Sequence, residues 1–212
     1  MEGLYNNKDL YYKAIENGII KADPLKGIIV RKPEGNRLYL FKEEVLRLET
    51  KYSGFMTKDL KNVLQYFLFS CYTGLRYSDV KNLRFSNIEY DTDHPCIKFK
   101  QKKTSELVIM PLGKKAQKYI PAIGLPNQPV FNVYCNQVTN RLLKDIMTLT
   151  GINKNISFHC ARHTFAAFAL ELSRDIATVS NLLGHMKIST TQIYAKVLEV
   201  SKRNVIGLMD AI

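Results

Sequence analysis

The sequence lacks the features that would place the protein in a membrane, outside the cell or around a structural metal ion. No apolar run approaches the roughly 18 residues that a membrane-spanning helix needs, and no basic stretch followed by an apolar one marks a signal peptide. The four cysteines are widely spaced and form no Cys-x-x-Cys pair, so neither a zinc site nor a disulfide framework is indicated. We therefore expect an intracellular, cytoplasmic protein with reduced thiols.

Acidic residues are scarce relative to basic ones. There are 19 aspartates and glutamates against 31 lysines and arginines, which gives a net charge of +12. A surplus of this size on a small domain favours a polyanionic partner, DNA or RNA. Seven lysines but a single acid, Glu106, lie between Cys96 and Lys118, although a solvated lysine face that improves solubility would produce the same pattern. The acids show no cluster like the metal-binding carboxylates of nucleases and transposases.

What the sequence does contain is enough apolar residues, 46% of the chain, for a folded domain. Within residues 1–36, the pattern predicts a short helix over 7–17 that stops at Gly18. The residues after Gly18 are rich in turn formers and are typical of a connector between domains. Residues 97–100 and 107–112 predict a β-hairpin with a lysine-rich tip. Apolar residues at helical spacing predict further helices over 42–50, 57–72, 113–120, 136–149, 159–172, 175–183 and 189–198. The expected fold is mostly α with a small antiparallel β-sheet (α+β).

Four short stretches stand out by their order along the chain. They are Thr73-Gly74-Leu75-Arg76-Tyr77-Ser78-Asp79, Lys102-Lys103-Thr104, His159-Cys160-Ala161-Arg162-His163, and Leu182-Leu183-Gly184-His185 followed nine residues later by Tyr194. Together they resemble the tyrosine recombinase family of the phage-integrase type: an arginine in a T-G-x-R turn, a hairpin lysine, H-x-x-R opening a helix, L-G-H, and a tyrosine nine residues on. Each stretch alone is a weak signal, but the ordered set is specific.

The resemblance covers residues 37–212 and implies the tyrosine recombinase catalytic-domain fold for them. Residues 1–36 then correspond to the end of the family's core-binding, SAM-like N-terminal domain and its linker. One departure is local, since Phe41 stands where the family usually has a threonine or serine cap before a helix beginning at Lys42. In style the sequence resembles integrases of Bacteroides-type mobile elements, which implies a bacterial protein associated with the nucleoid.

The two arginines of the pattern suit phosphodiester chemistry whatever the family. Attack of a hydroxyl on a phosphodiester adds negative charge to the non-bridging oxygens, and the planar guanidinium groups of Arg76 and Arg162 can bind those oxygens in pairs. His159 and Arg162 are three residues apart at a predicted helix start, where the helix N-terminus favours an anion. In the alternative interpretation, His159 only caps its helix and Arg162 pairs with a surface acid.

The hairpin lysines are candidates for proton transfer and for DNA contact. At the hairpin tip, Lys103 is placed to protonate the leaving 5′ oxygen as a general acid. We prefer Lys103 to its neighbour Lys102 because the family's lysine commonly precedes a threonine in this loop. Lys100, Lys102 and Lys103 are expected to bind DNA, and for either tip lysine a DNA-backbone contact alone is the alternative.

The resemblance assigns the nucleophile to Tyr194, on the predicted helix 189–198. Its attack gives a 3′-phosphotyrosyl enzyme and a free 5′-hydroxyl, and the reaction needs no energy cofactor and no metal. His185, at a helix exit after Gly184, is expected to hydrogen-bond a phosphate oxygen. Asp79 and His163 have supporting roles. For Tyr194 the alternative is a buried aromatic with a satisfied hydroxyl.

Zinc is not expected at the pair His159 and His163. Their i, i+4 spacing matches half of a metal motif, but the glutamate of H-E-x-x-H and an evident third ligand are missing.

The C-terminal residues carry an apolar stripe at helical spacing, formed by Val205, Leu208, Met209 and Ile212. The resemblance implies that this segment docks on a neighbouring protomer, so that a homotetramer assembles on double-stranded DNA.

The sequence therefore predicts a site-specific DNA recombinase or integrase, with two alternatives from other classes. A type IB topoisomerase shares the phosphotyrosyl chemistry but does not join different duplexes. A non-catalytic helix-turn-helix module over residues 175–198 would bind DNA only. The second alternative leaves the joint presence of Arg76, His159, Arg162 and Tyr194 without an explanation.

Overall fold

The computed structural model describes residues 13–21, 38–90, 95–100, 107–122, 124–185 and 187–194. The chain forms two units, residues 1–36 and residues 37–212. In the first unit, residues 13–16 are helical and Gly18 takes a left-handed φ of 69°, as a glycine stop requires. That residues 1–36 are the end of a core-binding domain stays a prediction.

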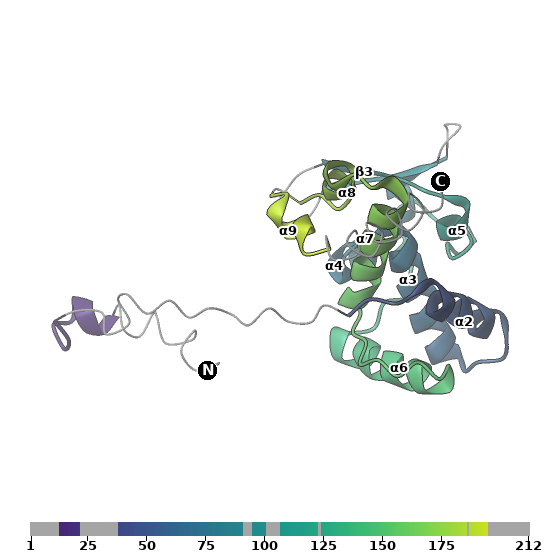
Figure 1. The fold of residues 1–212 in the computed structure, drawn as a ribbon, viewed down its shortest axis with the longest axis horizontal. Helices are drawn as coiled ribbons and strands as arrows, with labels where there is room; N and C mark the ends of the chain where they lie inside the picture. The colour runs from purple at the N-terminus through teal and green to yellow at the C-terminus, as the bar shows by residue number, and fades with distance from the viewer. Residues whose placement is uncertain are drawn as a thin grey trace, which may run out of the picture. The chain divides into compact units, whose positions relative to one another are not determined.

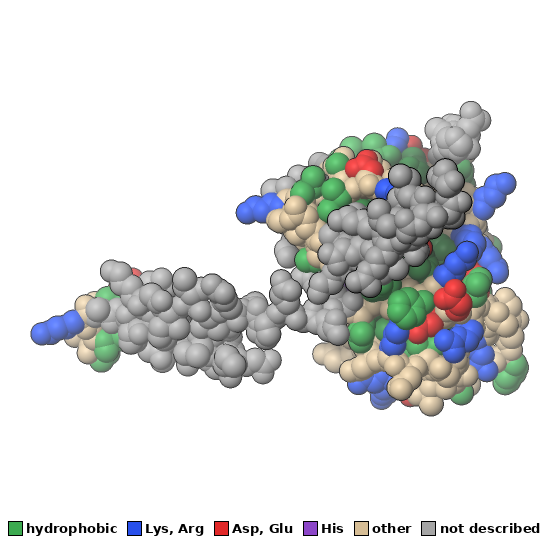
Figure 2. Space-filling model, in the orientation of Figure 1, with side chains coloured by type: hydrophobic (Ala, Val, Ile, Leu, Met, Phe, Trp, Pro, Cys, Tyr) green, Lys and Arg blue, Asp and Glu red, His purple; other side chains and the backbone are tan. Residues whose placement is uncertain are grey.

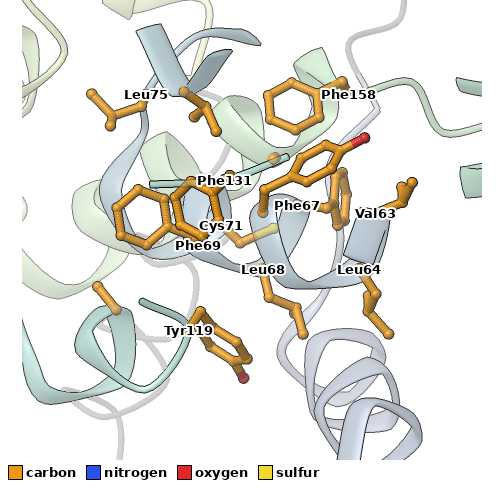
Figure 3. Packing of buried hydrophobic residues seen from close by; sticks show 14 of the residues in the cluster. Val63, Leu64, Phe67, Leu68, Phe69, Cys71, Leu75, Tyr119, Phe131 and Phe158 are labelled. Carbon is orange, nitrogen blue, oxygen red and sulfur yellow. The ribbon is translucent and has the colours of Figure 1, made fainter. Parts of the chain in front are cut away.

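Two long helices form the centre of the second unit. Helix α3 (Lys58–Thr73) packs along α7 (His159–Ser173), and α2 (Lys42–Ser53) and α6 (Asn136–Leu149) also pack against α3 (Figure 1). Helix α3 is buried on most sides because it lies between these neighbours. Its apolar side chains point into one continuous core, in which Phe67 meets Phe158 at a ring-centroid distance of 6.0 Å (Figure 3).

The small sheet is antiparallel, with β2 between its two neighbours. Strands β1 (Ile88–Glu89), β2 (Cys96–Lys100) and β3 (Leu107–Pro111) lie in that order. Ile97 of β2 pairs with Ile88 and with Met110, and all three side chains are buried. The predicted hairpin is confirmed. Strand β1 was not expected, because two residues are too short to show the alternation by which strands are recognised. The hairpin tip, with Lys102 and Lys103, lies outside the described residues.

The remaining elements are short. They are α4 (Tyr77–Asn82), the 3-10 helix η2 (Phe85–Asn87), α5 (Lys114–Gln117), α8 (Ile176–Leu182) and α9 (Ser189–Gln192). Most predicted helices are present, but α4 was not foreseen. The placement of Tyr194 inside a helix over 189–198 was wrong: in the described chain α9 ends at Gln192, and Tyr194 lies in the following turn. Residues 195–198 lie outside the described residues.

Helix α2 begins without a serine or threonine cap, and its start is stabilised in another way. The Glu44 carboxylate accepts the Phe41 N–H at 2.6 Å, which is the second half of a capping box. The ammonium group of Lys154 bonds the same carboxylate oxygen at 2.6 Å and lies 3.6 Å from the centre of the Phe41 ring. The Leu40 N–H bonds the hydroxyl of Thr164 on α7 at 2.9 Å, so the start of α2 is tied to α7.

A second, smaller apolar cluster joins α7 to α8 and to the turn after α9. Its buried members are Ala166, Leu170, Val179, Leu183 and Tyr194. The Tyr194 ring is therefore held by apolar contacts from two helices, and this cluster places the turn that carries it. We call this group the tyrosine cluster.

A groove with a volume of about 650 Å³ opens between α2, α3 and α7. Its lining is largely apolar, and it includes Leu46 and Leu172, which are 45% and 85% exposed. Lys42, Lys115 and Glu171 also line it. In the described part of the chain, no helix combines the length and the apolar character needed to cross a membrane.

Candidate active site

The first arginine is placed by the turn that follows α3. Gly74 has a left-handed φ of 68° and donates its N–H to the Ser70 carbonyl at 2.8 Å, which ends the helix. A Cβ at Gly74 would lie 2.5 Å from Cδ1 of Phe165 on α7, so the close approach of the turn to α7 also requires glycine. The turn therefore presents Arg76 at the start of α4, directly beside α7.

The backbone N–H of Arg76 is hydrogen-bonded, but one nitrogen of its guanidinium group has no hydrogen-bond acceptor among the described residues. The Asp79 carboxylate accepts the Arg76 N–H at 3.1 Å and lies 4.0 Å from the guanidinium Nη1. Nη1 is buried, and no described residue accepts a hydrogen bond from it. A buried donor without a partner costs about 1–3 kcal/mol, and a phosphate oxygen would satisfy it. Asp79 thus lies beside Arg76, and its supporting role stays a prediction.

The second arginine, Arg162, joins the two glycine turns of the site. Its Nη1 donates to the Gly74 carbonyl at 2.7 Å and its Nη2 to the Leu183 carbonyl at 2.5 Å, and the side chain is almost fully buried. Arg162 therefore does not pair with a surface acid, and that alternative is wrong. These bonds use two of the five N–H donors of a guanidinium group.

The pKa of Arg162 is shifted by burial and by three neighbouring ionisable groups. Burial and, to a lesser extent, the positive charge of Arg76 lower the pKa of Arg162 to about 10, although Tyr194 and Asp79 act in the opposite direction. A pKa near 10 leaves the group charged at neutral pH. Two guanidinium groups, one phenol and one carboxylate are thus electrostatically coupled at one place.

Helix α7 begins at His159, as the sequence predicts, and its first two turns carry three residues of the site. His159 is exposed, and its ring centroid lies 4.5 Å from that of His163 one turn further on. The N-cap position belongs to Phe158, so the interpretation of His159 as a mere cap is wrong. His163 is buried, and its Nδ1 is hydrogen-bonded to the Tyr194 hydroxyl. Residues at i, i+3 and i+4 share a helix face, which explains why these three lie together.

His185 is held between the end of α8 and α9. Gly184 ends the helix with a left-handed φ of 60°, and the His185 N–H bonds the Ser180 carbonyl at 3.0 Å. Its Nδ1 is 2.8 Å from the hydroxyl of Thr191, which is fully buried in α9. Thr191 thus sets the orientation of the ring. Nothing in the sequence pointed to Thr191, because a single threonine six residues after a histidine matches no motif.

The structure brings most of the predicted site residues together. Hydrogen bonds, ring contacts and electrostatic coupling connect the set Arg76, Asp79, His159, Arg162, His163 and Tyr194, and His185 follows the turn that Arg162 binds. Lys102 and Lys103 lie outside the described residues. The backbone of Lys100 ends strand β2, and it pairs with Leu107. Where the chain is described, no group of three or more histidine, cysteine, aspartate or glutamate side chains is placed to hold a metal ion.

The family follows from a match over most of the chain. The model of the phage integrase family matches residues 42–200. The chain belongs to this family. As a phage integrase family member, it is 29% identical over 203 residues to the tyrosine recombinase XerC of Pseudomonas fluorescens, covering 88% of this chain and 65% of that protein. To the tyrosine recombinase XerD of Listeria monocytogenes it is 35% identical over 151 residues, covering 63% of this chain and 49% of that protein.

Solved structures show the same fold for this integrase-family chain. The XerH recombinase in a post-cleavage complex with difH substrate has a TM-score of 0.67 at 18% identity, over 90% of this chain and 59% of that one. A lambda integrase dimer on a core site has a TM-score of 0.66 at 17% identity, over 88% and 69%. The predicted fold class is confirmed. The chain spans about two thirds or less of the length of the curated relatives described above.

Proposed function

We propose that this chain catalyses site-specific DNA recombination, cleaving and rejoining strands through a 3′-phosphotyrosyl intermediate on Tyr194. The observation that carries the proposal is that Arg76, Arg162 and Tyr194 meet at one place: Arg162 bonds the carbonyl of Gly74, two residues before Arg76, and Tyr194 bonds His163, the residue after Arg162 on α7. A nucleophilic hydroxyl beside two guanidinium groups is the arrangement that attack on a phosphodiester requires. The phage integrase family match and the tyrosine recombinase relatives support the same activity.

In this proposal the arginines hold the scissile phosphate. The buried Nη1 of Arg76 donates to one non-bridging oxygen, and Arg162 donates to the phosphate through N–H groups other than the two that bind backbone carbonyls. Two positive charges in a water-poor site stabilise the extra negative charge that develops during attack. Asp79 keeps the Arg76 backbone in place.

The other site residues complete the reaction. His159 and His185 hydrogen-bond the phosphate oxygens, and Lys103 donates a proton to the 5′ oxygen as the P–O bond breaks. Lys100 and Lys102 bind the DNA backbone beside the cleavage site. Lysine and arginine side chains are spread over the face seen in Figure 2, among fewer acidic ones, which suits a DNA partner. The phosphotyrosyl bond conserves the energy of the phosphodiester, so that a 5′-hydroxyl of a second strand can reverse the step.

The test uses nicked suicide duplexes with a randomised core, because the recognition sequence is not known. Cleavage beside the nick releases a short fragment and traps the covalent protein–DNA product, which a denaturing gel separates and sequencing of the bound DNA identifies. We expect a covalent band in EDTA from the wild type, no band from Tyr194→Phe, and joining of two different duplexes that carry the recovered sequence. A band from Tyr194→Phe would refute the nucleophile. Relaxation of supercoils without joining would indicate a topoisomerase, and DNA binding without any band a helix-turn-helix module.

We also propose that the protein assembles as a tetramer on DNA through its C-terminal segment. In this proposal the apolar stripe from Val205 to Ile212 docks into the apolar groove between α2, α3 and α7 of a neighbouring copy and covers its exposed Leu46 and Leu172. Deletion of residues 203–212 and Leu172→Asp should each abolish the tetramer on DNA in a gel-shift assay. Leu149→Asp, at an exposed leucine of α6 that does not line the groove, is the matched control. Unchanged assembly in both test variants would exclude this mode of docking.

The cellular setting is proposed from the resemblance to integrases of Bacteroides-type mobile elements. We place the protein in the bacterial cytoplasm, on the nucleoid, where it would act on the ends of such an element. The recovered core sequence tests this origin: it should occur at the junction of the element and the chromosome. A match to the chromosome-dimer resolution site of the host would contradict it.

A further inference from the structure

One contact in the site has no role in phosphate binding. The Nδ1 atom of His163 is hydrogen-bonded to the hydroxyl of Tyr194, and each of the two side chains is only 6% exposed. Their ring centroids are 5.5 Å apart with the planes inclined at 53°, which points the imidazole nitrogen at the phenol oxygen rather than stacking the rings. The contact therefore involves the one tyrosine atom that would react.

Both partners of this contact are held in place by their surroundings. Tyr194 packs in the tyrosine cluster against side chains such as Leu170 and Leu183, so its hydroxyl is fixed relative to α7. His163 lies on α7 itself, with the ring of His159 at 4.5 Å in an edge-on arrangement. An exposed tyrosine would share its proton with water, but this hydroxyl is enclosed and meets an imidazole.

The chemistry of the attack requires a proton acceptor at this position. A tyrosine phenol has an ordinary pKa near 10, so only about one molecule in a thousand is ionised at neutral pH. Removal of the proton during attack therefore speeds cleavage, and imidazole is the side chain whose ordinary pKa lies nearest neutral pH. The nearby guanidinium groups stabilise the phenolate that forms, since Tyr194 and Arg162 are electrostatically coupled.

We propose that His163 is the general base of the reaction, a catalytic residue and not only a supporting one. In cleavage the Tyr194 proton moves to Nδ1 of His163 while the tyrosine oxygen bonds to phosphorus and the P–O5′ bond breaks, its electron pair taking a proton from Lys103. In rejoining, a 5′-hydroxyl gives its proton back to Lys103 and bonds to phosphorus, while the bond from phosphorus to the tyrosine oxygen breaks and that oxygen takes back the proton from His163. This inference rests on the proposed function, with Tyr194 as the nucleophile.

Two substitutions separate a base from a residue that only positions the tyrosine. His163→Asn places an amide near the position of Nδ1, where it can still hydrogen-bond the phenol but cannot take a proton. His163→Ala removes both functions and leaves space for added imidazole. Single-turnover cleavage of the suicide duplex is measured from about pH 6 to about pH 9, the range over which imidazole ordinarily changes from a poor to a full base.

For a general base we expect both variants to cleave about 100-fold more slowly at neutral pH. The wild-type rate should level off with rising pH, whereas the variant rates should climb about tenfold per pH unit as the phenol ionises by itself. Imidazole in the buffer should restore part of the rate of His163→Ala but not of His163→Asn. The ionisable groups around the pair are the same in every variant: Arg76, Asp79, His159 and Arg162, with His185 two residues beyond the Leu183 carbonyl that Arg162 binds.

Three outcomes would overturn the inference. The first is a folded His163→Asn variant that cleaves at the wild-type rate with the wild-type pH profile, and the second is a folded His163→Ala variant that imidazole does not restore. The third is a wild-type rate that climbs tenfold per pH unit over the whole range, since hydroxide would then take the proton; this test applies even if the variants do not fold. Leu170→Ala, a cavity variant in the tyrosine cluster, controls for lost stability and should keep the levelled profile. Failure of the proposed function is distinct, because then the wild type gives no covalent band.

Discussion

The two halves of the active site differ in how firmly the fold supports them. Arg76 follows a turn that packs on the main core, and Arg162 lies inside α7, one of the two central helices. Tyr194 instead follows a helix of four residues and is held by the small tyrosine cluster and the bond to His163. The half proposed to bind the phosphate thus shares the stability of the whole domain, whereas Tyr194, the proposed nucleophile, depends on a few local contacts. We therefore expect that the turn carrying Tyr194 can be displaced without unfolding the rest of the domain.

The largest effect is expected from Arg162→Met, which keeps most of the volume and removes the donors. The carbonyls of Gly74 and Leu183 would lose their charged partner, so we expect unfolding free energy to fall by about 3 kcal/mol. Cleavage should fall by about three orders of magnitude. Chemical denaturation and single-turnover cleavage measure the two effects. The control is Arg84→Met: Arg84 also bonds a backbone carbonyl but is exposed, and a loss as large there would contradict the role of burial.

Leu170→Ala separates the two halves most directly. A fully buried leucine in the tyrosine cluster should cost about 3 kcal/mol of stability when truncated. Its matched control is Leu143→Ala, at an equally buried leucine of the main core. Both variants should bind DNA, but only Leu170→Ala should slow cleavage, by about tenfold, because it loosens the support of Tyr194. Equal slowing in both variants would remove the distinction between the halves.

Gly74→Ala should disturb the turn that places Arg76. The left-handed backbone costs alanine about 1 kcal/mol, and the contact with Phe165 raises the expected loss to about 2 kcal/mol. Gly151→Ala is the control, since Gly151 has a similar φ of 65° but no atom within 4 Å of the added Cβ. Thermal unfolding should therefore show a larger shift for Gly74→Ala, and Phe165→Leu should recover part of it. Equal shifts for the two glycines would show that the close approach to α7 contributes nothing.

The smallest effect is expected from Thr191→Val, which removes the hydroxyl that bonds His185. Stability should fall by about 1 kcal/mol, and cleavage by about tenfold if the orientation of the imidazole matters. Thr139→Val removes a buried hydroxyl that bonds Tyr66 far along the chain from the site, and serves as control. The two variants should unfold alike in denaturant but differ in cleavage rate. The same cleavage rate in both would leave Thr191 with a structural role only.

The sequence was most informative where a local signal was strong. The amphipathic pattern over 136–149 predicted α6 to the residue, and the glycine of the L-G-H turn marked the end of α8. Helix α4 was missed because six residues are too few for a periodic pattern. The assignment of Tyr194 to a helix failed because residues near it are compatible with both helix and turn, and packing against α7 and α8 decides.

The site residues were named from their motifs, but the contacts among them were not readable from sequence. Arg162 bonds a carbonyl 88 residues away and another 21 residues away, and neither acceptor carries a side-chain signal, because every residue has a backbone carbonyl. The bond between His163 and Tyr194 also depends on how α7 and the turn after α9 pack together. The order of the motifs thus identified the residues of the site, but only the folded structure shows which of their atoms form hydrogen bonds.

The position of Arg162 between two carbonyls has a thermodynamic consequence. One guanidinium group touches the turn before Arg76 and the turn before His185, so a shift of either turn changes how the group presents its remaining donors to DNA. Occupancy of the phosphate site and the arrangement of the segment that leads to Tyr194 are therefore linked equilibria. This coupling is reciprocal. If ordering of the segment that carries Tyr194 raises the affinity for DNA by some factor, bound DNA raises the equilibrium constant for ordering that segment by the same factor.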